Sequence, residues 1–173
     1  WSKFGFKEKI IYFPFKSPSW VRRNLSENHP KRKYAAIVGS FSKGTLISKP
    51  SKTFIDAGWE MRFFLESVDL DLISYGENSD FVFCKHNFGF VKNLDQLMSQ
   101  TSVLIMASDL GWGFKTKIAD AIELDQLVIV NRKLASKLGS WRNAIMELED
   151  WANFKNFESL PDLRKSALMS ILR

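Results

Sequence analysis

A stretch that combines two glycines with two lysines is the part of the sequence best suited to chemistry. Gly111, Gly113, Lys115 and Lys117 stand at the start of a predicted helix. Glycine lets a backbone approach a ligand closely, and the amide groups at a helix N-terminus attract anions. The helix dipole disfavours lysine at this end of a helix, so two lysines here favour a nearby phosphate. The stretch therefore predicts a diphosphate site.

Four further side chains are candidates for the same site. Asp120 could accept hydrogen bonds from ribose hydroxyls, or it is a solvated carboxylate near the start of the helix. Trp112 could stack on a base or cover the site, or it fills a hydrophobic gap. Asp109 could bind a sugar hydroxyl or cap its loop, and Lys43 could reach a phosphate or be an ordinary surface lysine. The motif is neither a Walker A loop nor the Gly-x-Gly-x-x-Gly dinucleotide fingerprint.

The composition restricts the partners and excludes some kinds of site. The chain has a net charge of +6, with basic residues concentrated near its start. This charge suits nucleic acid, an anionic membrane surface or an anionic small substrate, and it equally suits a solvated basic face. One cysteine and two histidines exclude a disulfide framework and a histidine-rich metal site. Cys84, within an apolar run, is expected to be a buried thiol.

No window approaches about 18 consecutive apolar residues, and no signal-peptide pattern is present. We therefore expect a cytoplasmic protein, which would be membrane-peripheral if the basic stretch binds anionic lipid.

Short apolar runs alternate with helical patterns along most of the chain, which predicts an α/β fold. This pattern is typical of a Rossmann-like parallel sheet with helices on both faces. Ligands in such sheets bind beyond the carboxyl ends of the strands, here the loops 39–44, 75–80 and 107–113. The strands are predicted at 34–39, 70–76, 103–106 and 127–130, with shorter extended pieces at 81–83 and 88–91, and the helices at 53–67, 94–100, 113–123, 133–137, 141–151 and 160–172.

The first part of the sequence differs from the rest. Residues 1–33 contain a possible strand at 10–13 and proline-rich and polar connector segments. We expect 1–33 to be a linker, and 34–173 to be one ligand-binding domain with C-terminal helices.

Several segments, taken in order, resemble the GT-B glycosyltransferases. The segment 87–97 resembles their "GFV-x-x-L-x-x-L" motif, and 102–107 resembles the strand that follows it. The segment 111–121 resembles the family's "GxGxKxKxxEA" motif, with Asp120 where the family usually has glutamate. The runs 127–130 and 34–39 resemble two further strands of these enzymes. The resemblance covers about residues 34–139.

The resemblance implies the C-terminal, donor-binding half of a GT-B enzyme of the group 1 type. Such a domain binds a nucleotide-diphosphate sugar as substrate, with the lysine-bearing helix start facing the diphosphate and the acidic residue holding the ribose. It implies a hexosyltransferase of polysaccharide or glycoconjugate synthesis, inactive without an acceptor domain or a partner subunit. On this resemblance, residues 1–33 would be either the linker or the remnant of an acceptor-side domain. No cofactor is implied. No metal is expected, because the helix start and its lysines can take the charge of the diphosphate.

Two other functions remain open from the sequence. The chain could be a non-catalytic GT-B-like subunit or interaction module, or a basic α/β domain that binds nucleic acid. The basic residues of the connector at 22–33 stand among proline and asparagine with no Phe, Tyr or Trp between them, which disfavours nucleic acid.

Overall fold

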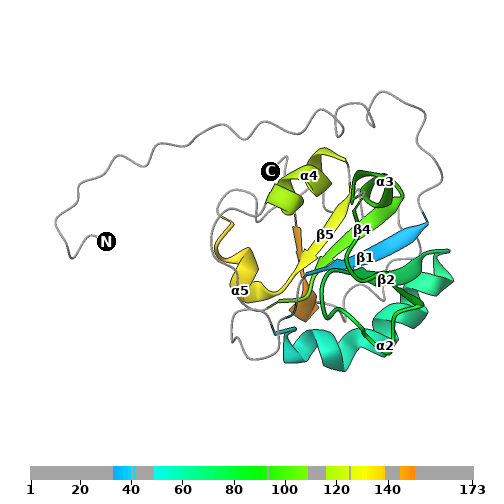
Figure 1. Ribbon diagram of the computed structural model, residues 1–173. Coiled ribbons are helices and arrows are strands. Elements are labelled where there is room, and N and C mark those ends of the chain that lie inside the picture. The colour runs from blue at the N-terminus through cyan, green and yellow to red at the C-terminus, as the bar shows by residue number, and fades with distance from the viewer. Residues whose placement is uncertain are drawn as a thin grey trace.

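The protein is built around one parallel sheet (Figure 1). The computed structural model describes residues 33–39, 41, 49–92, 94–108, 116–124, 126–138 and 145–150. Within these residues, six strands form one sheet in the order β3-β2-β1-β4-β5-β6, and every neighbouring pair is parallel. The strands are β1 Tyr34–Val38, β2 Asp71–Tyr75, β3 His86–Asn87, β4 Thr101–Met106, β5 Leu127–Val130 and β6 Ile145–Glu147. The predicted Rossmann-like α/β fold is confirmed.

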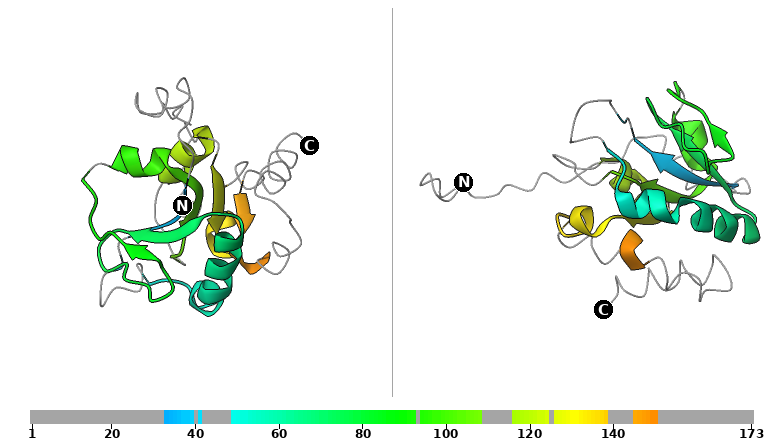
Figure 2. Two further views of the ribbon diagram at one scale, coloured as in Figure 1. Left: turned by 90° about the vertical axis from the view of Figure 1, so that its right-hand side faces the viewer. Right: turned by 90° about the horizontal axis from the view of Figure 1, so that it is seen from below.

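Helices cover both faces of the sheet. Figures 1 and 2 show α2 on one side and α3 and α4 on the other. The core is divided in the same way, because alternate residues of β1 belong to different clusters: Ile37 lies with α2 residues, and Val38 lies with residues of α3 and α4. The described helices are α2 Lys52–Ser67, α3 Leu94–Ser99, α4 Thr116–Glu123, α5 Arg132–Ala135 and the 3-10 turn η4 Leu148–Asp150.

The strand order explains this division of the helices. From β1 the chain moves through β2 to β3 at one edge, and then returns across the sheet to β4 and β5. Connections between parallel strands are right-handed, so a reversal of direction moves the connecting helices to the opposite face. The reversal lies between β1 and β4. In open α/β sheets the crevice at such a reversal, beyond the carboxyl ends of the strands, is where ligands bind.

Most of the predicted elements are confirmed over the described residues. The strands β1, β2 and β5 match their apolar runs closely, and α2, α3, α4 and α5 lie where helices are expected. The strand β4 begins two residues before its apolar run, because Thr101 and Ser102 are also buried. Cys84 is buried as expected, and its burial raises the pKa of the thiol to about 12. The possible strand at 10–13 and the helix at 160–172 lie outside the described residues.

The two extended pieces predicted at 81–83 and 88–91 are wrong. The strand in this region is the polar pair His86–Asn87, which lies beside β2 at the edge of the sheet. Phe81 and Phe83 are instead buried in a loop, where they pack against α2. The two-residue spacing of these phenylalanines therefore arises because both side chains fill the core, and it does not mark a paired strand.

The helix predicted at 141–151 is also wrong over residues 145–150. Ile145–Glu147 forms β6, which pairs with β5, and η4 follows it. Ile145 and Met146 pack against opposite faces of the sheet, as successive residues of a strand do. Ile145 and Leu148 are spaced as in a helix, which explains the error. No described helix has the length and apolar character needed to cross a membrane.

Candidate functional site

The candidate site is the carboxyl edge of the sheet, where the strand order reverses. Tyr75 and Val38 are paired there at the ends of β2 and β1, and Met106 and Val130 are paired at the ends of β4 and β5. The chain before α2 lies against the chain after β4. Ser51 donates its backbone N–H to the Ala107 carbonyl at 2.8 Å, and an antiparallel bridge joins Pro50 and Ser108. The two segments that leave β1 and β4 are thus fixed together.

Ser51 also begins α2. Its hydroxyl accepts a hydrogen bond from the backbone N–H of Phe54 at 3.1 Å, which is the usual N-cap geometry. The same residue therefore caps the helix and ties its start to the end of β4. A serine three residues before the first buried position of a helix is a recognisable cap signal that the sequence interpretation did not use.

Asn131 connects the end of β5 to the same edge of the sheet. Its side chain is 1% exposed, and its Oδ1 accepts a hydrogen bond from the backbone N–H of Leu134 at 2.8 Å. Its Nδ2 donates to the carbonyl of Ser108 in the segment after β4. One amide therefore caps α5 and contacts Ser108, just after β4. The sequence interpretation missed Asn131, although an asparagine between a strand and a helix is a cap signal.

We expect Asn131→Ala to lower the free energy of unfolding by about 1–2 kcal/mol. The variant removes a helix cap and leaves the partly buried carbonyl of Ser108 without this donor. Denaturant titration measures the change. Ser136→Ala, which removes an exposed hydroxyl from the opposite end of the same helix, is the control and is expected to change stability by less than about 0.5 kcal/mol. Equal effects of the two substitutions would contradict the role given to Asn131.

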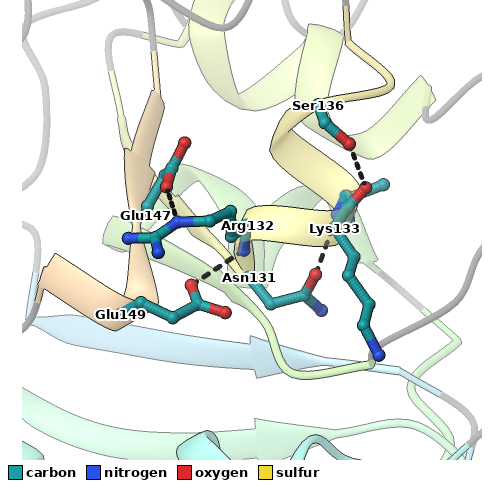
Figure 3. A network of polar contacts seen from close by, with 7 residues as sticks. Asn131, Arg132, Lys133, Ser136, Glu147 and Glu149 are labelled. Carbon is teal, nitrogen blue, oxygen red and sulfur yellow. Dashed lines mark hydrogen bonds and ion pairs between the residues drawn. The ribbon is translucent and has the colours of Figure 1, made fainter.

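Carboxylates surround the start of α5 (Figure 3). Glu149 accepts the backbone N–H of Arg132 at 2.8 Å, and Glu147 accepts from Nε of the same arginine at 2.7 Å. These contacts fasten β6 and η4 to the end of β5. The first backbone N–H of α5 is thus occupied by the Glu149 carboxylate, which leaves it unavailable to a phosphate.

Two of the predicted site residues lie in the described part of the chain. Lys117 and Asp120 are both in α4, three positions apart, so they are neighbours on the helix surface. The remaining predicted residues lie outside the described residues, and the structure does not place them: Lys43, Asp109, Gly111, Trp112, Gly113 and Lys115.

Lys117 reaches across the point where the strand order reverses. It belongs to α4, which connects β4 to β5, and its Nζ lies 5.9 Å from the centre of the Tyr75 ring at the end of β2. Because β1 lies between β2 and β4, the lysine side chain spans both halves of the sheet at the carboxyl edge. This places a cation beside the expected ligand crevice.

Asp120 is not a solvated carboxylate. It is 9% exposed and lies between the buried residues Ala119 and Ala121, and Ile118 two positions earlier is also buried. The alternative of a solvated surface residue is therefore wrong. A buried carboxylate is costly unless charged or hydrogen-bonding groups compensate it. The burial of Asp120 therefore favours a specific role over that of an ordinary surface residue.

No metal centre is formed by the described residues. Among them, no group of three or more His, Cys, Asp or Glu side chains is placed to hold a metal ion. Among the described residues of α4, the charged side chains nearest the β1–β4 reversal are Lys117 and, deeper in the fold, Asp120. Such a pair can bind an anionic group and accept hydrogen bonds from hydroxyl groups.

A scan against models of protein families finds none that matches this chain, and a search of curated proteins finds no matching sequence.

Proposed function

We propose that this chain is the donor-binding domain of a glycosyltransferase and binds a nucleotide-diphosphate sugar at the carboxyl edge of its sheet. The observation that carries the proposal is the position of Lys117, whose ammonium group lies at the reversal of strand order. This is the place where open α/β sheets bind nucleotides. The ordered resemblance of 34–139 to GT-B enzymes supports a sugar nucleotide over other nucleotides.

In the proposed site, the start of α4 faces the diphosphate. Lys117 supplies positive charge from the described part of the helix, and Lys115 with the amides near Gly111 and Gly113 would add to it. Glycosyl transfer develops negative charge on the departing diphosphate, so cations and oriented amides placed there lower the barrier. The acceptor would come from another domain or a partner subunit.

Asp120 is the proposed ribose contact. It lies one helical turn beyond Lys117, on the sheet-facing side of α4. A carboxylate oxygen accepts two hydrogen bonds and suits the paired hydroxyls of ribose. In this arrangement the phosphate meets the cation nearer the helix start and the sugar lies further along the helix.

Lys117→Ala is expected to weaken the binding of UDP by more than about tenfold, or ~1.4 kcal/mol. Calorimetric titration measures the affinity directly. Lys33→Ala is the matched control, because Lys33 is an exposed lysine just before β1, at the opposite edge of the sheet. The control should bind UDP like the unaltered chain. If Lys117→Ala and Lys33→Ala leave the affinity equally unchanged, the phosphate role of Lys117 is wrong.

A further inference from the structure

Tyr75 is a buried aromatic residue at the edge of the sheet where the ligand is proposed to bind. It is the last residue of β2, and its side chain belongs to the core cluster on the α3 and α4 face. Its hydroxyl donates to Sδ of Met98 in α3 at 3.0 Å. The ring is therefore held from one side by α3 and meets Lys117 of α4 on another.

The contact between this ring and Lys117 is a cation–π contact. The ammonium nitrogen lies 5.9 Å from the ring centre, within the roughly 6 Å over which the ring quadrupole attracts a cation. Burial raises the pKa of the Tyr75 hydroxyl far above its ordinary value, so the phenol stays neutral. The ring consequently adds no negative charge of its own beside the lysine.

A lysine ammonium on a four-carbon stem is flexible, and fixing it costs conformational entropy when a ligand binds. A rigid neutral ring beside the ammonium restricts its motion before a ligand binds, so less conformational entropy is lost on binding.

We propose that Tyr75 is a positioning residue, whose ring holds the Lys117 ammonium over the β1–β4 reversal in readiness for the diphosphate. The inference rests on the proposed function, because it assigns Tyr75 a part in the same site. No residue of β2 was a candidate from the sequence alone. The inference gives this strand a part in the same site as the proposed phosphate-binding helix, which lies on the other side of β1.

Calorimetric titration with UDP tests the inference through four variants. Tyr75→Leu removes the ring and is expected to weaken binding by about threefold to tenfold, whereas Tyr75→Phe keeps the ring and should bind within about twofold of the unaltered chain. Tyr34→Leu is the matched control, since Tyr34 packs against the same core cluster from the amino end of β1. Tyr75→Leu combined with Lys117→Ala should bind no more weakly than Lys117→Ala alone.

The results separate this inference from the proposed function. If the unaltered chain does not bind UDP, the proposed function fails. If it binds UDP and Lys117→Ala weakens binding, but Tyr75→Leu binds like the unaltered chain or like Tyr34→Leu, the role of Tyr75 is overturned.

A measurement on the unaltered chain tests the contact on which the inference depends, even if Tyr75→Leu does not fold. The ring should shift the nuclear magnetic resonance signals of the Lys117 Hε protons upfield, with the assignment made from their loss in Lys117→Ala. Hε signals at the position of a free lysine would overturn the inference.

Discussion

Replacing Phe54 with alanine is expected to lower the free energy of unfolding by about 3–5 kcal/mol. Phe54 is fully buried in α2, and its ring meets Phe81 at 5.2 Å and Phe83 at 5.4 Å between ring centres, both edge to face. Truncation removes the ring from the centre of this aromatic cluster and leaves a cavity that the rigid helix and sheet can only partly fill. Denaturant titration followed by circular dichroism measures the loss.

Phe63→Ala is the matched control for this prediction. Phe63 lies in the same helix and is 64% exposed. Its truncation is expected to change stability by less than about 1 kcal/mol, because it creates no cavity. A Phe54→Ala cost no larger than that of Phe63→Ala would contradict the placement of α2 on the core.

Gly58→Ala is expected to lower the free energy of unfolding by about 1–3 kcal/mol. Gly58 is a buried glycine in the middle of α2, and a Cβ built on it would lie 2.4 Å from the Phe83 ring. That ring is stacked on Phe81 at 5.4 Å and meets Phe54, so it has little room to move. In an exposed helix the same substitution would stabilise by ~1 kcal/mol, so the sign of the effect depends on the close packing.

A double-mutant cycle with Phe83→Leu tests the cause of this effect. Leucine in place of Phe83 removes the ring atoms that the new Cβ would meet. The Gly58→Ala substitution should therefore be neutral or stabilising in that background. An equal cost in both backgrounds would show that the Phe83 contact does not explain the need for glycine.

The sequence predicts an element best where the spacing of its buried residues matches the repeat of a helix or a strand. The strands β1, β4 and β5 are buried on both faces, so they read as continuous apolar runs. The helix α2 repeats its buried residues every three or four positions. The edge strands carry no such signal. The pair His86–Asn87 is polar and exposed, and β6 contains only three residues.

The candidate site was predictable in its location but not in its contacts. Alternation of strands and helices implies a carboxyl edge, and the glycine–lysine stretch points to the start of α4. The sequence places the loop 75–80 at the same edge as the start of α4, but the order of the strands does not follow from periodicity, so the contact between Tyr75 and Lys117 could not be predicted. Asn131 and Ser51 read locally as caps, whereas their bonds to Ser108 and Ala107 depend on the packing of distant segments.

The burial of Asp120 shows the same limit. Its position in the helix followed from the sequence, but a carboxylate near a helix start is compatible with solvent as well as with the core. Only the packing of α4 against the sheet decides that this side chain is buried.

Calorimetric titration of the chain with UDP, GDP and ADP, each compared with its nucleoside, tests the central claim most directly. The proposed diphosphate site predicts saturable binding of at least one nucleoside diphosphate, with its nucleoside at least about tenfold weaker. Absence of binding by all three diphosphates, or a nucleoside that binds as tightly as its diphosphate, would contradict the claim.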